Sequence, residues 1–129
     1  MEDKEENKIL IGKDDIIYID VSKEDLSGEY ILELMKETIE IIRKFSGKGK
    51  VLANFSKSVL KVGSSEERKR MVKLIQDAYK DPGFDKIAIC GVSTLLKIVS
   101  FFVVKATKIE NIRVFKTKEE GLKWLRRNS

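Results

Sequence analysis

The sequence contains no histidine, and only one cysteine and one proline among its 129 residues. Without histidine the chain lacks the commonest general base and the commonest metal ligand of proteins. A single cysteine excludes an intramolecular disulfide bond and a zinc site built on cysteines. One proline and eight glycines exclude collagen-like and proline-rich disordered chains. We therefore predict a protein that is not an enzyme and that holds no metal and no cofactor.

Hydrophobic residues make up 42% of the chain and charged residues 36%, which is enough apolar material for the core of one domain. The longest apolar stretch, residues 98–104, is interrupted by Ser100 and is far shorter than the roughly 20 residues that cross a bilayer. Residues 1–7 are polar and acidic, unlike a signal or transit peptide. These features predict a cytoplasmic protein with a polar tail over residues 1–7, a single domain over residues 8–129 and no membrane span.

The net charge of +5 is unevenly divided along the chain. Residues 1–30 hold four lysines against ten acidic residues, a net charge of −6, so the remainder carries +11. A basic surface can attract phosphates, acidic partners or an anionic membrane, although a solvated surface rich in Lys and Glu explains it as well. The basic residues are not interleaved with aromatic residues, so a nucleic-acid channel is not expected.

Hydrophobic patterns predict strands that alternate with helices. Two β-branched runs separated by turn-forming residues, 8–12 and 16–21, predict a hairpin. Further strands are predicted at 51–55, 87–92 and 112–116, and amphipathic helices at 29–45, at 95–108 and after the capping patterns Ser64–Glu67 and Thr117–Glu120. The segment between residue 55 and Ser64 is expected to be a loop. The order β-β-α-β-α-β-α-β-α predicts an α/β domain with a mixed, mostly parallel sheet.

Polar groups near the end of the strand at 87–92 are candidate sites. Cys90 has no histidine to activate it, which indicates a buried, inert thiol. Ser93 and Thr94 lead into the third helix, where free amides and hydroxyl groups could hold an anion beside Lys97. A plain helix cap is the simpler interpretation of these two residues, and both interpretations stay open.

The third predicted helix, residues 95–108, has more apolar residues than one buried face needs. At about 100° per residue, the face expected to be buried holds Leu95, Ile98, Val99, Phe102, Val103 and Ala106. The outer face then holds Lys97, Ser100, Phe101 and Val104, with Lys105 at its margin. Exposed Phe101 and Val104 predict contact with a partner helix, a lipid or a hydrophobic ligand. Cover by a neighbouring helix, or burial on all sides, is the alternative.

The C-terminal third resembles a known family. The segment KIAICGVSTLLK, a hydrophobic helix and the segment NIRVFKTKEEGLKWL are similar to the SpoIIAA-like branch of the STAS domains. These domains are relatives of sporulation anti-sigma-factor antagonists and of the lipid-binding CRAL-TRIO type. The most specific element is Val114-Phe115, a polar link, Glu119-Glu120 and then Leu122 to Leu125. The resemblance implies a STAS-like fold.

The resemblance also implies regulation by phosphorylation. The antagonists carry an Asp-Ser-Ser step at the start of the second helix, where a partner kinase modifies a serine. Ser64 and Ser65 correspond to this step after a one-residue insertion, with Gly63 in place of the aspartate, and are the candidate phosphorylation sites. A phosphate there would lie at a helix N-terminus, where negative charge is favoured. Ser64 is equally explained as a helix cap.

Two functional hypotheses follow. The first is a non-enzymatic regulatory or adaptor domain that binds a protein partner or self-associates, with serine phosphorylation modulating the contact. Its anchor would be Phe101 and Val104, with Lys97 and Lys105 at the rim. The second is a carrier or sensor of a small hydrophobic or lipid-like ligand held between the third helix and the sheet. A cavity beneath that helix favours the second hypothesis, and a solid core favours the first.

Overall fold

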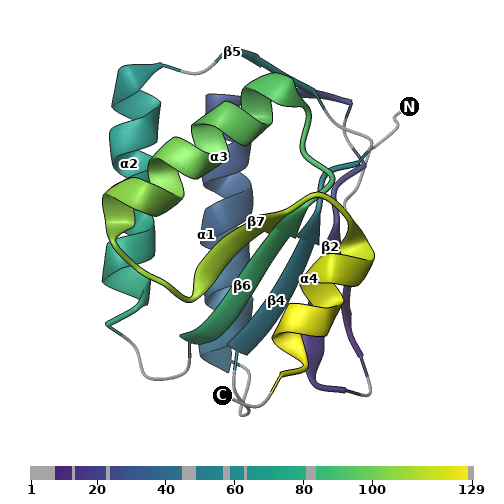
Figure 1. Cartoon of the computed structure of the whole chain (residues 1–129). Helices are drawn as coiled ribbons and strands as arrows, with labels where there is room; N and C mark the ends of the chain where they lie inside the picture. Colours follow the sequence, from purple (N-terminus) through teal and green to yellow (C-terminus); the bar gives the residue numbers. More distant parts are fainter. Residues whose placement is uncertain are drawn as a thin grey trace, which may run out of the picture.

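The computed structural model describes residues 8–12, 14–22, 24–44, 49–56, 59–62, 64–80 and 84–127, without the side chains of residues 8, 59–62, 94 and 95. The tail predicted over residues 1–7 lies outside this range. The elements are β1 (Lys8–Ile11), β2 (Ile16–Asp20), β3 (Asp25–Ser27), α1 (Gly28–Lys44), β4 (Gly49–Asn54), β5 (Val59–Val62), α2 (Ser65–Ala78), β6 (Phe84–Cys90), α3 (Thr94–Thr107), β7 (Ile112–Phe115) and α4 (Lys118–Leu125). The predicted single α/β domain is confirmed (Figure 1). No helix in the described ranges is long and apolar enough to pass through a membrane.

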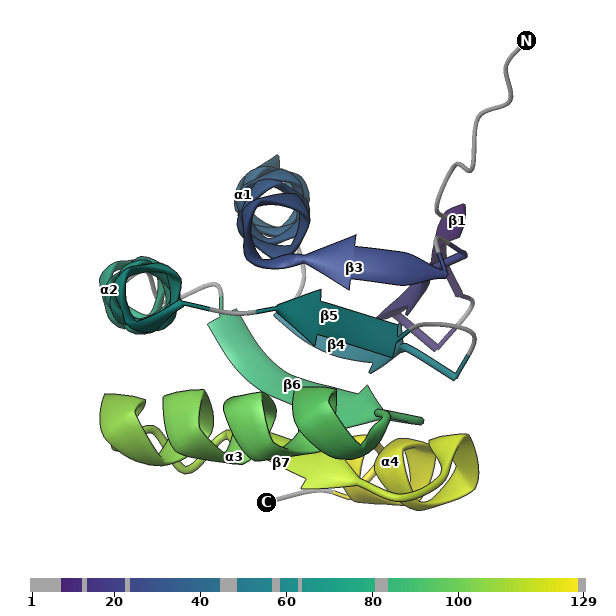
Figure 2. The same ribbon diagram turned by 90° about the horizontal axis from the view of Figure 1, so that it is seen from above.

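A five-stranded mixed sheet forms the centre of the domain. Its strand order is β1-β2-β4-β6-β7, with β1 antiparallel to β2 and the other neighbours parallel. The view from above shows α1, α2 and α3 on one side of the curved sheet and α4 on the other (Figure 2). The predicted mostly parallel sheet and its opening hairpin are therefore confirmed.

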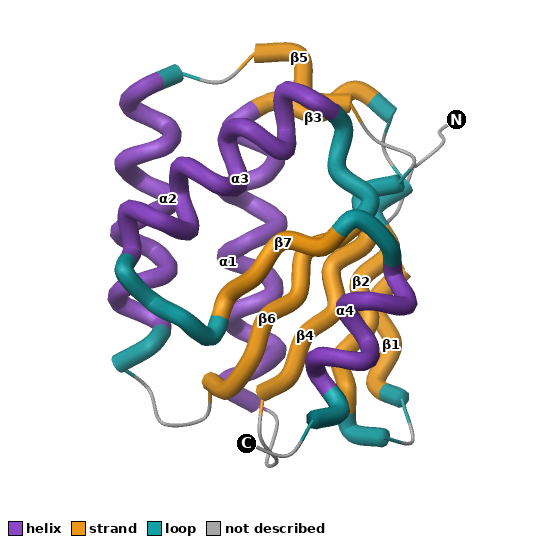
Figure 3. Tube along the Cα trace, in the orientation of Figure 1, coloured by secondary structure: helices purple, strands orange, loops and turns teal. Residues whose placement is uncertain are grey.

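A second, two-stranded sheet was not expected from the sequence. β3 pairs in parallel with β5, at Asp25 with Val59 and at Leu26 with Leu60. The interpretation of the segment before Ser64 as a loop was therefore wrong for residues 59–62. Strands of three and four residues give a weak periodic signal, and their pairing depends on a partner about 34 positions away in the chain, as the register shows. Figure 3 shows this small sheet at the end of the domain where α1 and α2 begin.

Both predicted capping boxes are present. The Ser64 hydroxyl accepts a hydrogen bond from the Glu67 amide at 3.0 Å, and the Glu67 carboxylate accepts one from the Ser64 amide at 3.1 Å. Thr117 and Glu120 repeat the arrangement at the start of α4, with distances of 3.2 and 3.4 Å. Each box satisfies amides that the first helical turn leaves without a partner. These local signals therefore set where α2 and α4 begin.

Each face of the sheet has its own hydrophobic core. Because side chains alternate along a strand, Val51 of β4 packs with the cluster under α1, α2 and α3, whereas Leu52 packs with the cluster under α4. On the α4 side, Trp124 and Leu125 are buried against Ala88 of β6. The larger core on the opposite side is the one that contains the candidate site.

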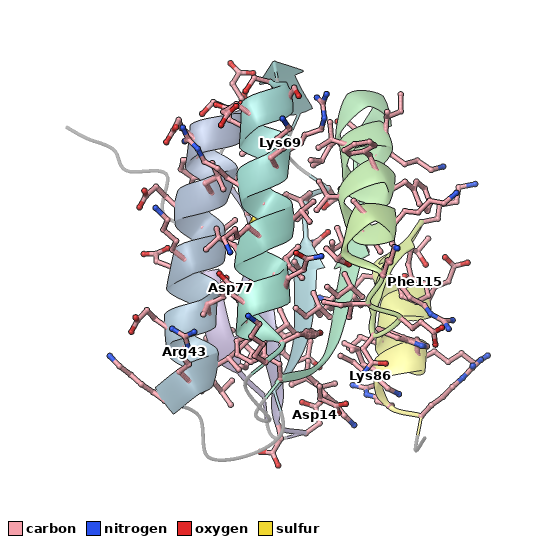
Figure 4. All side chains as sticks on the ribbon, turned by 90° about the vertical axis from the view of Figure 1, so that its left-hand side faces the viewer. Asp14, Arg43, Lys69, Asp77, Lys86 and Phe115 are labelled. Carbon is pink, nitrogen blue, oxygen red and sulfur yellow. The ribbon has the colours of Figure 1, made fainter. Side chains whose placement is uncertain are left out.

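Two residues hold the end of α4 through polar contacts: Asp14, in the turn between β1 and β2, and Lys86 of β6. Asp14 accepts hydrogen bonds from the Tyr18 hydroxyl at 2.8 Å and from Arg126 at 3.1 Å. Burial alone would raise the pKa of Asp14, but these hydrogen bonds hold it below its usual value. Lys86 of β6 is buried, and its ammonium group donates to the Trp124 carbonyl at 3.4 Å and to the Arg127 carbonyl at 3.2 Å. Figure 4 shows Lys86 beside the end of α4.

Replacing Lys86 with methionine tests its contact with α4. The variant keeps much of the apolar stem but loses two charge-assisted hydrogen bonds to helix-terminal carbonyls, so we expect a loss of about 1–3 kcal/mol in the free energy of unfolding. Urea denaturation measures this change. Lys123→Met, at an exposed position of α4, is the control. Its free energy of unfolding should stay within about 0.5 kcal/mol of the wild-type value. Equal stability of the two variants would contradict the assigned role.

Candidate functional site

An apolar cavity of about 150 Å³ lies between the sheet and the helices α1, α2 and α3. Its wall on the sheet side comes from inward-facing residues of neighbouring strands, namely Ile19, Val51, Ala53, Ile87, Ile89 and Ile112. The helices line its other walls with residues that include Leu34, Ile42, Met71, Ile75, Val99 and Val103. Figure 4 shows the three helices side by side over this face of the sheet. The cavity therefore occupies the middle of the larger core.

Small residues on three different elements face the cavity. Ala53 lies on β4, Ala78 on α2 and Ser100 on α3, and all three line the space. Protein interiors are normally packed to the density of organic crystals, with few voids larger than a water molecule. A short side chain on each of three walls leaves volume that leucine or isoleucine would fill. The cavity thus follows from residue size at these positions.

Three lining side chains carry a polar group. The Thr38 hydroxyl donates to the Leu34 carbonyl at 2.9 Å, and the Tyr79 hydroxyl donates to the Asp85 carbonyl at 3.3 Å. Burial, with a smaller contribution from the Asp85 carboxylate, raises the pKa of Tyr79 far above its ordinary value, so its phenol stays protonated. Ser100 is only 9% exposed, and its hydroxyl has no hydrogen-bond partner among the described residues. The cavity is consequently apolar, with one polar group that is not already engaged.

The rotation of α3 differs from the predicted one. Its buried face consists of Leu96, Val99, Ser100, Val103 and Thr107, whereas Ile98 and Phe102 are 61% and 55% exposed. The prediction was therefore wrong for Ile98, Phe102 and Ser100, and also for Ala106, which is exposed; the Leu95 side chain lies outside the described set. Apolar residues surround most of this helix, so periodicity alone leaves its rotation open. Thr107 is accommodated inside because its hydroxyl donates to the Val104 carbonyl at 2.7 Å.

The outer face of α3 agrees with the predicted one only in part. Phe101 is 50% exposed, and Lys97 and Lys105 are exposed, as predicted. Val104 is half-buried and lines the cavity, so its assignment to the outer surface was wrong. The outer apolar residues are instead Ile98, Phe101 and Phe102, which we call the α3 patch. The guanidinium group of Arg68, on α2, lies 5.3 Å from the centre of the Phe102 ring.

The candidate anion site is only partly described. Ser93 is the N-cap residue of α3, but its side chain makes no capping hydrogen bond, and its buried hydroxyl lacks a partner within the described residues. The Thr94 side chain lies outside the described set. Cys90 nearby is buried as predicted, its thiol donates to the Ala53 carbonyl at 3.6 Å, and burial raises its pKa to about 11. That thiol is therefore protonated and shielded near neutral pH.

The candidate phosphorylation sites lie at the start of α2. The Ser64 hydroxyl is engaged in the capping box, and Ser65 is exposed in the first turn. Helix capping explains the environment of Ser64, and Gly63 lies outside the described residues. From the sequence, a pocket between the third helix and the sheet was a requirement of the ligand hypothesis alone. The small residues Ala53 and Ala78 within apolar segments were a weak signal for it.

No model of a known protein family matches the chain, and no curated protein matches it either. Over the ranges that the structure describes, no group of three or more histidine, cysteine, aspartate or glutamate side chains could hold a metal ion. The resemblance to the STAS domains stays a prediction. The cavity and the α3 patch are therefore the candidate functional sites.

Replacing Ser64 and Ser65 separately with alanine distinguishes the cap from its neighbour. Ser64→Ala removes the hydroxyl of the capping box, so we expect a loss of about 1 kcal/mol in the free energy of unfolding. Ser65→Ala, one residue later and exposed, should change it by less than about 0.5 kcal/mol. Thermal and urea unfolding of both variants measure the difference. A larger loss from Ser65→Ala than from Ser64→Ala would show that the cap is misassigned.

Proposed function

We propose that the protein binds a small hydrophobic molecule in the cavity beneath α3, as a carrier or sensor and without catalysing a reaction. The observation that carries the proposal is the apolar space lined by the sheet and three helices. A solid core at this place would have favoured the adaptor hypothesis. The cavity supports the ligand-binding hypothesis instead.

The size of the cavity restricts the ligand. An apolar cavity of roughly 150 Å³ in a protein core stays dry and accepts a molecule of the size of benzene. Pockets for drug-sized ligands are larger, at roughly 300–1,000 Å³, and the present cavity has about 150 Å³. The proposed ligand is therefore a compact molecule and not a long acyl chain.

The driving force for binding comes from the lining. Side chains around an empty space lack van der Waals partners on one side, and a ligand of matching shape restores those contacts. The ligand also leaves water, which is favourable in proportion to its apolar surface. Because Val99 and Val103 of α3 and Ile87 of β6 all line the space, binding should stabilise the fold.

Toluene is a suitable probe of the cavity. We expect toluene at ten times its dissociation constant to stabilise the wild-type protein by about 1.4 kcal/mol, measured as a rise in melting temperature. Ala53→Leu places three further carbons in the cavity, so this variant should lose the toluene response while keeping or gaining stability. Ala106→Leu, on the exposed side of α3, is the matched control and should respond as the wild type does.

Two results would count against the proposal. The first is an absence of any toluene effect on the wild-type protein near the solubility limit of toluene. The second is an undiminished effect in Ala53→Leu. Should the central strand reject leucine at residue 53, Ala78→Leu fills the cavity from the α2 side and answers the same question.

The α3 patch favours a second candidate function, the binding of a protein partner. Ile98, Phe101 and Phe102 are at least half exposed on one side of α3, which is unusual for large apolar residues in one cluster. Lys97, Lys105 and Arg68 place positive charge around them. This surface fits an acidic, amphipathic segment of a partner protein. We also propose that this binding takes place in the cytoplasm, the location predicted from the sequence.

Phosphorylation would act on this surface through Arg68. Ser64 and Ser65 precede Arg68 by four and three residues, and helix residues at these spacings are neighbours. A phosphate on either serine would attract the guanidinium group that lies over Phe102. The position of Arg68 at the edge of the α3 patch would then change, and with it the contact with a partner.

Phe101→Asp tests the patch, because a carboxylate at its centre opposes an acidic, apolar partner. We expect the variant to lose a partner that co-purifies with the wild-type protein and that elutes with rising salt. Lys123→Asp, on α4, is the control and should retain it. Mass spectrometry identifies the retained protein and its acidic segment. If the wild-type protein, Phe101→Asp and Lys123→Asp all retain the same set of proteins, binding of a partner by the α3 patch is contradicted.

A further inference from the structure

We infer that the ligand of the cavity is a neutral molecule with a single hydrogen-bonding group, of the phenol or short-chain alcohol class, and that this group pairs with the Ser100 hydroxyl. The inference rests on the proposed binding of a ligand in the cavity and adds its chemical class. Three observations carry it: the unengaged hydroxyl of Ser100, the engagement of the other polar groups of the lining, and the absence of charge there.

Ser100 is an exception among the hydroxyl groups on the inner faces of the helices. Thr38 and Thr107 also lie on such faces, and each donates to a carbonyl of the preceding turn, at 2.9 and 2.7 Å. Serine can usually make the same local bond. Ser100 makes none among the described residues, although it is 9% exposed and lines the cavity. Its hydroxyl is thus available to a molecule in the cavity.

An unpaired hydroxyl group in a core has an energetic cost. A fully buried donor or acceptor without a partner costs about 1–3 kcal/mol. The cost at Ser100 is smaller, because its hydroxyl oxygen is not fully buried, and a partner in the cavity reduces it. A buried water molecule is a poor partner, because it needs two to four polar groups. The hydroxyls of Thr38 and Tyr79 are already engaged. A ligand that brings one hydroxyl group of its own can form a hydrogen bond with Ser100.

The lining also defines what the ligand cannot be. The described residues that line the cavity include no aspartate, glutamate, lysine or arginine. Burying an ionised carboxylate or ammonium group without a partner is far more costly than burying a hydroxyl. A serine hydroxyl can donate one hydrogen bond and also accept hydrogen bonds, as the hydroxyl of a phenol or an alcohol can. The site therefore suits a neutral ring or short alkyl group with one hydroxyl.

Calorimetric titration of the full chain with phenol and with toluene tests this inference. The wild-type protein should bind both. Ser100→Ala should weaken phenol binding about ten-fold or more, because the ligand hydroxyl loses its partner. The affinity of this variant for toluene should stay within about two-fold of the wild-type affinity or exceed it. Thr38→Val is the matched control, since its hydroxyl is engaged within α1, and it should keep the wild-type ratio of the two affinities.

Each outcome is informative. If toluene binds and phenol does not, or if Ser100→Ala leaves the ratio of the two affinities unchanged, the inference about Ser100 is overturned and the proposed cavity site stands. If neither probe binds the wild-type protein, both fail. Ser100→Ala should melt no lower than the wild type, because the replaced hydroxyl has no protein partner. A clear loss of stability, or failure to fold, would show a structural hydrogen bond and overturn the inference.

Discussion

The packing of three helices onto one face of the sheet is the constraint on which the rest of the structure depends. The parallel strands β2, β4, β6 and β7 follow one another in space in the same order as in the chain. Right-handed crossovers between strands added in one direction place every connecting helix on the same face. α1, α2 and α3 therefore share one side, and α4 alone covers the other (Figure 2). The cavity lies where those three helices meet over the strands.

The helix α3 links the two surfaces that bear on function. Its inner side contributes Val99, Ser100 and Val103 to the cavity, and its outer side exposes the α3 patch. One helix with apolar residues on nearly all sides thus serves two environments. The composition of the helix explains both the cavity wall and the exposed aromatic rings, and neither surface requires catalysis, a metal ion or a disulfide bond.

Sequence reasoning predicted the features that are coded locally. The capping boxes at Ser64 and Thr117, the order of the main elements and the burial of Cys90 depend on short patterns, and all are confirmed. The pairing of β3 with β5 depends on a distant partner and was missed. The rotation of α3 was wrong for Ile98 and Phe102, because only packing distinguishes the faces of such a helix. A cavity arises from side-chain volumes on several elements, and no single segment encodes it.

A crystal of the protein pressurised with xenon tests the cavity most directly. Xenon occupies dry, apolar cavities of roughly this size and scatters strongly enough to be located. We predict a xenon atom between the sheet and α3, within contact distance of Ala53 and Val103. Side chains that fill this space and leave no xenon density there would contradict the account, and the α3 patch would then be the remaining candidate site.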